Sequence, residues 1–130
     1  MKSWRGWMSV WALLWLCTVG AAWAQGDARP PADQRFVVFH KPGPAWQPQT
    51  PLFQQPGLDK HIAHYRQWQQ QGKLSLGGPF MDSGFGGMMI SESGLTEDEV
   101  KAFAVADPAV HSGLLTFEVR RWLVGMKSGK

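Results

Sequence analysis

The chain has 130 residues, a formal net charge of +3 and a single cysteine. This length supports one domain with a modest core rather than several domains. One cysteine excludes an intrachain disulfide framework and a site built from several thiolates.

Residues 1–24 are predicted to be a secretory signal peptide. Lys2 and Arg5 provide a positively charged start, an almost wholly apolar run follows, and a small-x-small motif ends at Ala24. The alternative is an uncleaved membrane anchor, which the short apolar run disfavours. We therefore expect a periplasmic or secreted protein that is cleaved after Ala24 and has no attachment to the membrane.

Cleavage would change the character of the chain. It removes five of the eight tryptophans, the cysteine and two positive charges, so the net charge falls from +3 to +1. So small a charge gives no support for nucleic-acid binding. We divide the mature chain into a polar, flexible leader at 25–34, a folded domain at 35–125 and a C-terminal tail at 126–130.

The first predicted elements are a strand, a long irregular segment and a helix. Residues 35–40 are a β-branched and aromatic run typical of a strand. Residues 41–57 contain five prolines, which exclude a regular helix, and we expect Trp46 and Phe53 to anchor this segment. Residues 58–71 have apolar side chains at helical spacing and are followed by a glycine, a common helix stop.

The remaining elements are three strands and a second helix. The strands are predicted from short apolar runs at 73–76, 88–91 and 114–124. A glycine-rich hairpin connection is expected at 82–87. Thr96 and Glu99 form a capping box that begins the second helix, and the proline after Asp107 ends it.

The resulting order of elements is β-α-β-β-α-β. It predicts an α+β fold of the ferredoxin-like type, with two helices on one face of an antiparallel sheet. Two helices cover only one face, yet the strands supply apolar residues for both. We therefore expect a homodimer in which two sheets stack face to face.

His61 and Asp107 are the candidate catalytic residues. On a helical wheel His61 lies at the edge of the apolar face, beside Trp68, whereas His64 points toward solvent. Asp107 continues the apolar face of the second helix at the negative end of its dipole, where a carboxylate needs a partner. If the two side chains meet, the carboxylate orients the imidazole for general acid–base work. The alternatives are a boundary histidine with no function and a local Asp-Pro helix stop.

A glycine-rich segment is predicted to line the ligand pocket. It comprises Gly77, Gly78 and Pro79, and Trp46 and Trp68 are expected as further walls. A strand end that bends into a hairpin explains the glycines equally well. The segment is not a phosphate loop, because no lysine or hydroxyl follows at the required spacing.

No metal or other cofactor is expected. His61 and His64 lie three residues apart on the predicted helix and would need a third ligand. No acidic or histidine cluster at ligand spacing supplies one.

Several motifs follow one another over nearly the whole mature chain. They are the helical His61, a Gly-Lys-Leu eleven residues later, Gly-Gly-Pro at 77–79, a glycine-rich hairpin and Ala-Asp-Pro at 106–108. This succession resembles the YCII-related (YciI-like) proteins of the dimeric α+β barrel superfamily. The resemblance implies that His61 and Asp107 line an active-site cleft. Some relatives carry an arginine three residues before the histidine, where this chain has Leu58, so an anion contact from that position is missing.

The leading hypothesis is a small-molecule enzyme in which His61 is the general acid or base and Asp107 orients it. The resemblance implies isomerisation or elimination on a small cyclic or acidic compound, which suits a dyad without a metal. One alternative is a non-catalytic binding or interaction module with a structural His/Asp pair. Another is haem binding, known elsewhere in the superfamily.

Overall fold

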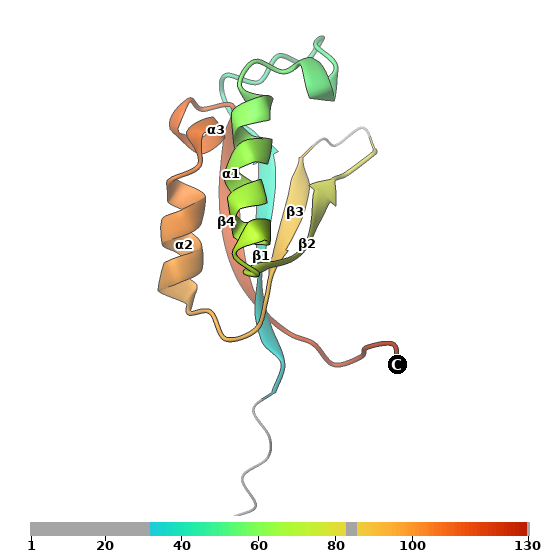
Figure 1. Ribbon diagram of the computed structural model, residues 1–130. Helices are drawn as coiled ribbons and strands as arrows, with labels where there is room; N and C mark the ends of the chain where they lie inside the picture. Colours follow the sequence, from blue (N-terminus) through green and yellow to red (C-terminus); the bar gives the residue numbers. More distant parts are fainter. Residues whose placement is uncertain (1–31, 83–85, 130) are drawn as a thin grey trace, which may run out of the picture.

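The computed structural model describes residues 32–82 and 86–129 (Figure 1). The predicted signal peptide, the predicted leader up to residue 31 and the tip of the predicted hairpin lie outside the described residues. The elements are β1 (Gln34–Pro42), a 3-10 turn η1 (Leu52–Gln54), α1 (Leu58–Gln70), β2 (Leu74–Pro79), β3 (Gly87–Ser91), α2 (Glu97–Val105), α3 (Pro108–His111) and β4 (Leu115–Leu123). None of the helices in this part of the chain has the length and hydrophobicity needed to cross a bilayer.

The four strands form one antiparallel sheet in the order β2-β3-β1-β4. In β1, Val38 pairs with Met89 of β3 on one side and with Val119 of β4 on the other. Both long helices cover the same face of this sheet (Figure 1). The architecture confirms the ferredoxin-like α+β prediction.

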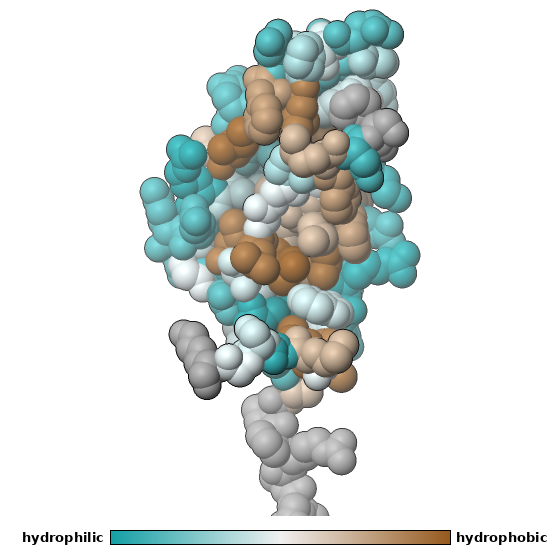
Figure 2. Space-filling model, turned by 90° about the vertical axis from the view of Figure 1, so that its right-hand side faces the viewer, coloured by the Kyte–Doolittle hydropathy of each residue, from teal (hydrophilic) through white to brown (hydrophobic). Residues whose placement is uncertain are grey.

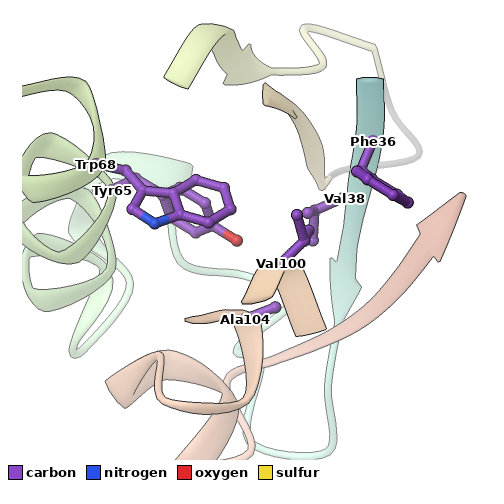
Figure 3. Packing of buried hydrophobic residues seen from close by; sticks show 6 residues of the cluster. All are labelled: Phe36, Val38, Tyr65, Trp68, Val100 and Ala104. Atoms are coloured by element: carbon purple, nitrogen blue, oxygen red, sulfur yellow. The ribbon is translucent and has the colours of Figure 1, made fainter. Parts of the chain in front are cut away.

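The core lies between the sheet and the two helices. Its buried members come from β1, α1 and α2, two from each: Phe36, Val38, Tyr65, Trp68, Val100 and Ala104 (Figure 3). Alternate residues of β1 therefore point toward the helices, as the period of a strand requires. The next position on that face of β1 is His40, which is 2 % exposed.

The start of α2 agrees with the sequence, but its end differs. The Thr96 side chain accepts from the Glu99 backbone N–H, and the Glu99 carboxylate accepts from the Thr96 N–H, which is the predicted capping box. At its other end α2 stops at Val105, and the chain turns into the separate short helix α3. Asp107 is the N-cap of α3 rather than the last residue of α2.

The proline-rich segment before α1 contradicts one prediction. Trp46 is partly buried and packs against the cluster around Leu58 and Leu114, as an anchor should. Phe53 is 70 % exposed and anchors nothing. Gln55 holds the segment together instead, because its side-chain amide donates to the backbone carbonyls of Gln47 and Thr50.

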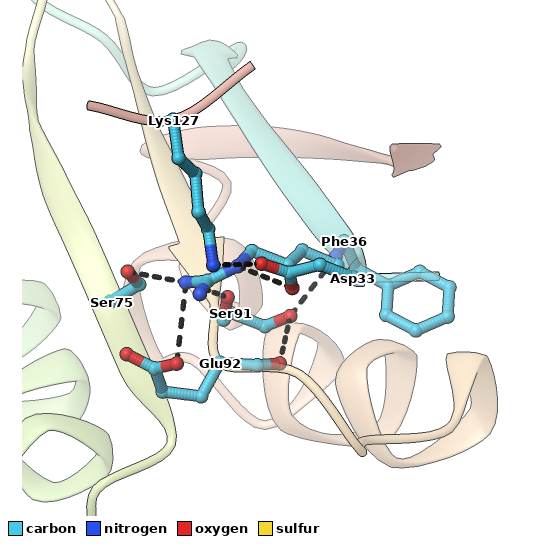
Figure 4. Close-up of polar contacts among 7 residues, drawn as sticks. Asp33, Phe36, Ser75, Ser91, Glu92 and Lys127 are labelled. Carbon is cyan, nitrogen blue, oxygen red and sulfur yellow. Dashed lines mark hydrogen bonds and ion pairs between the residues drawn. The ribbon is translucent and has the colours of Figure 1, made fainter. Parts of the chain in front are cut away.

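A polar cluster closes the opposite end of the sheet from this segment. Arg35 of β1 forms ion pairs with Asp33 and Glu92 and donates to the Ser75 hydroxyl (Figure 4). Lys127 pairs with Asp33, which ties the C-terminal segment to the start of β1 (Figure 4). The four charged side chains of this cluster are therefore paired with one another.

Candidate active site

His61 and Asp107 meet. The Nδ1 of His61, on α1, lies 2.5 Å from the Oδ2 of Asp107, at the junction of α2 and α3. The two residues are 46 positions apart in the chain. The contact crosses from one helix to the end of the other, and both side chains are buried.

Asp107 is satisfied in a way that the sequence reading did not foresee. Its Oδ1 accepts a hydrogen bond of 2.9 Å from the backbone N–H of Ala109. The carboxylate thus caps the start of α3 and does not lie at an unfavourable helix end, so the predicted electrostatic conflict is wrong. Burial alone would raise the pKa of Asp107, but the hydrogen bonds from His61 and Ala109 outweigh burial and hold it below its ordinary value.

The pairing sets the protonation of the His61 ring. Because Asp107 is ionised at neutral pH, it accepts, and the His61 Nδ1 must carry the proton that it donates. The lone pair of the neutral ring then lies on Nε2. His61 lines a cavity, so Nε2 is the nitrogen available to a ligand there.

His40 is a third member of the cluster, and the sequence analysis missed it. Its ring lies edge to face with that of His61, with 4.8 Å between centroids, and its Nε2 is 2.9 Å from the Tyr65 hydroxyl. Burial, reinforced by the neighbouring His61, lowers the pKa of His40 from 6.5 to about 4. Burial and the charge of Asp107 raise the pKa of Tyr65 well above its ordinary value.

These two shifts fix the direction of the hydrogen bond. Tyr65 stays protonated and donates to Nε2 of a neutral His40, whose own proton is therefore on Nδ1. That buried Nδ1 has no hydrogen-bond partner among the described residues. Strand alternation could have revealed His40, since it follows Phe36 and Val38 on the core face of β1.

The dyad borders a cavity of about 400 Å³. Its walls come from α1, the proline-rich segment, β2 and the starts of β3 and β4. The lining residues are His40, Trp46, Leu52, Phe53, Leu58, His61, Ile62, Tyr65, Arg66, Gln69, Leu74, Ser75, Leu76, Gly77, Gly78, Pro79, Gly86, Gly87, Met89 and Leu115. A volume of this size suits a small ring compound.

Four of the five predicted pocket residues line this cavity: Trp46, Gly77, Gly78 and Pro79. Trp68 does not. It is 3 % exposed and stacks on Phe103 at 4.1 Å between ring centroids, inside the core. Ile62 of α1 is 39 % exposed and also lines the cavity.

Gly77 and Gly78 belong to β2 rather than to a loop. A Cβ on Gly77 would lie 2.2 Å from the Sδ of Met89, whereas a Cβ on Gly78 would meet nothing within 4 Å. Gly77 therefore admits the Met89 side chain to the cavity wall. Its proximity to Met89 explains the glycine without any close approach of ligand to backbone.

The structure changes which residues could bind a metal ion. His64 is half-buried, its Nε2 lies 2.8 Å from the carbonyl oxygen of Phe103, and it is not free to pair with His61 around an ion. Within the described residues, His40, His61 and Asp107 instead place one potential ligand atom each within 4.8 Å of one another. In the present arrangement the His61 and Asp107 atoms bond to each other, so an ion would have to displace their shared proton.

The comparisons with known proteins point the same way as the fold. No family model matches the chain, and no curated protein matches it. Among solved structures, it is similar to the 5-chloro-2-hydroxyhydroquinone dehydrochlorinase of Burkholderia phenoliruptrix AC1100, determined in complex with 2,5-dihydroxybenzoquinone. The identity is 27 % and the TM-score 0.50, over 70 % of this chain and 95 % of that one.

The chain has the fold of the dimeric α+β barrel superfamily. The similar protein is an enzyme of that superfamily and binds a small molecule.

Proposed function

We propose that this protein is a YciI-like small-molecule enzyme that uses His61 and Asp107 for general acid–base chemistry. The observation that carries the proposal is the 2.5 Å contact between His61 Nδ1 and Asp107 Oδ2 at the wall of a cavity. The similar structure supports a small ring compound with acidic protons as the ligand class, because it binds 2,5-dihydroxybenzoquinone.

The chemistry follows from the tautomer of His61. Nε2 takes a proton from an acidic carbon or hydroxyl of the ligand, and Asp107 stabilises the imidazolium that forms. In an isomerisation, the imidazolium returns a proton to a different atom of the ligand. In an elimination, the electron pair left behind forms a double bond, and the leaving group departs with its own bonding pair. Neither route needs an oxidant or a covalent intermediate.

Proton abstraction can be tested without knowing the natural substrate. A panel of small cyclic acids, lactones and hydroxylated rings is first screened for compounds that raise the melting temperature. The best compounds are then incubated in D₂O, and loss of their acidic C–H signal is followed by ¹H NMR. We expect exchange with the wild-type protein and exchange about 100-fold slower or more with His61→Gln.

The control for this experiment is His111→Gln, because His111 is exposed on α3 and does not line the cavity. It should exchange as the wild type does. Wild-type exchange rates in a folded His61→Gln protein would overturn the proposal, as would the absence of binding by every compound of the class.

A non-catalytic binding or interaction module is the second candidate. One observation favours it: Asp107 is 0 % exposed and also caps α3, so its pairing with His61 has a structural use. Such a module would bind a ligand without exchanging its protons. Its His61→Gln variant would lose stability while keeping ligand affinity.

We also propose that the protein is a homodimer. The sheet face away from the helices carries Val37, Phe39, Met88 and Ile90, by strand alternation and register. Hydrophobic side chains gather on the side of the molecule where β2 and β3 lie (Figure 2). Size-exclusion chromatography with light scattering tests this, and Met88→Glu should then give a monomer, whereas a monomeric wild type would contradict it.

We propose that residues 1–24 direct the chain out of the cytoplasm and are cleaved after Ala24. Mass spectrometry of the protein from a periplasmic or culture fraction should give a mature N-terminus at Gln25. An intact N-terminus on a cytoplasmic protein would contradict it.

A further inference from the structure

The lining of the cavity includes one permanent charge, on Arg66, whose side chain is also exposed to solvent. Of its twenty lining residues, none is an aspartate or glutamate, and the only lysine or arginine is Arg66. Asp107 lies behind the His61 ring and is not part of the lining. The remaining walls are largely aliphatic, aromatic or glycine, so little in the lining offsets the positive charge of Arg66.

Arg66 differs from most cations of the fold in having no carboxylate partner. Arg35, Lys101, Arg120, Arg121 and Lys127 all form ion pairs with acidic side chains. Within residues 32–82 and 86–129, the Arg66 side chain has no hydrogen bond or ion pair. Its guanidinium is therefore available to a group that enters the cavity.

The position of Arg66 places it on the same wall as the base. It follows His61 by five residues on α1, and the cavity face of that helix runs through His61, Ile62, Tyr65 and Arg66. Five residues of α-helix correspond to about 7.5 Å along the axis and about 140° around it, so His61 and Arg66 border the cavity face of α1 from opposite edges. The arginine side chain is long, so its guanidinium can reach an anionic group at one end of a ring-sized ligand whose acidic proton lies at His61.

Two aromatic side chains form a further part of the cavity wall. Trp46 and Phe53 line the cavity from the proline-rich segment, opposite the glycine-containing strand β2. Phe53 is 70 % exposed, so an aromatic surface is available to a flat ligand at the mouth. Phe53 therefore forms part of the cavity wall, although it does not anchor the proline-rich segment.

We propose that Arg66 selects a planar ring compound bearing an anionic group, a carboxylate or an ionised hydroxyl, and orients it with its reactive end toward His61. This inference rests on the cavity being the substrate site proposed above. The guanidinium offers a planar set of donors that matches a carboxylate in two parallel hydrogen bonds.

The test compares two ligands of equal size that differ in charge, benzoate and benzamide. Dissociation constants are measured by following backbone amide shifts in ¹H–¹⁵N NMR spectra. We expect benzoate to bind the wild-type protein about 10-fold more tightly than benzamide, the effect of one charge-assisted contact. In Arg66→Gln the ratio should fall to about 1, and in Arg66→Lys part of it should remain because the charge is kept.

The matched control is Lys60→Gln, which removes the same charge from an exposed position of α1 that does not line the cavity. It should keep the wild-type preference for benzoate. Equal binding of the two ligands by the wild type, an unchanged ratio in Arg66→Gln, or no binding of either ligand would each overturn the inference.

The ligand-preference test of Arg66 and the proton-exchange test of His61 can give opposite results. His61→Gln should abolish proton exchange but retain the preference for benzoate over benzamide. Loss of the preference alone would leave the acid–base proposal standing, and loss of exchange alone would leave the role of Arg66 standing.

Discussion

The rings of His40 and His61 lie edge to face, 4.8 Å apart between centroids and at 80° to each other. They come from a strand and a helix, and each ring has a hydrogen-bond partner of its own, Tyr65 for His40 and Asp107 for His61. Because both rings are buried, protonating both at once is unfavourable. The geometry keeps His40 neutral and leaves His61 as the histidine of the pair that bonds to a carboxylate.

His40 should make stability depend on pH. Its pKa is 6.5 in the unfolded chain and about 4 in the fold, so between these values the unfolded chain binds a proton that the folded chain does not. The free energy of unfolding should therefore fall as the pH drops from about 6.5 to about 4, by roughly 3 kcal/mol, and be fully retained above 6.5. Urea unfolding at a series of pH values measures this.

Substitution separates His40 from the other titrating groups. His40→Gln should flatten the decline over that pH interval, while the exposed His111→Gln should leave it unchanged. A decline of the same size in His40→Gln would show that another group causes it.

Asp107→Asn should change the tautomer of His61 while keeping the fold. The asparagine Oδ1 can still accept from Ala109, but its Nδ2 donates, so the His61 Nδ1 becomes an acceptor and its proton moves to Nε2. Nε2 is then no longer a base, and proton exchange should slow by about 10²–10⁴-fold. Ring ¹⁵N NMR detects the tautomer directly.

The exposed Asp98→Asn is the control for loss of a carboxylate from the same half of the chain. It should affect neither exchange nor the His61 tautomer. Undiminished exchange in Asp107→Asn would mean that the carboxylate does not orient the base.

The neighbouring glycines of β2 should respond differently to alanine. Gly77→Ala places a Cβ 2.2 Å from the Met89 Sδ, the far end of a flexible side chain, and should push it within the cavity wall. Because methionine can shift, the loss in unfolding free energy should stay below about 1 kcal/mol, while ligand binding weakens. Gly78→Ala has open space for its Cβ and should bind ligand as the wild type does. Ligand titration of the two variants compares them, and equal affinity would contradict this account of Gly77.

Metal removal should leave the activity intact. The atoms that an ion would need, His61 Nδ1 and Asp107 Oδ2, already bond to each other, and acid–base chemistry uses them in that state. Protein dialysed against a chelator should therefore keep its proton-exchange rate. Loss of exchange on chelation and its recovery with Zn²⁺ would assign His40, His61 and Asp107 to an ion instead.

Local patterns in the sequence were sufficient for the fold. Alternation along β1, apolar spacing along α1 and the capping box of Thr96 and Glu99 each report a preference of a few neighbouring residues. In the right order, such preferences leave few topologies for a chain of this size. The same patterns placed His61 at the edge of the apolar face and His64 toward solvent, whereas the structure buries His61 and half-buries His64 against Phe103.

What only the tertiary structure decided is how residues distant in the chain meet. The turn between α2 and α3 moves Asp107 from an expected helix end to a cap, and the packing of α1 on β1 brings His40 beside His61. The same packing turns Trp68 into the core and leaves Arg66 at the cavity. The sequence alone determined which side chains could carry chemistry. Their partners depended on how the helices pack across the sheet, which no local pattern encodes.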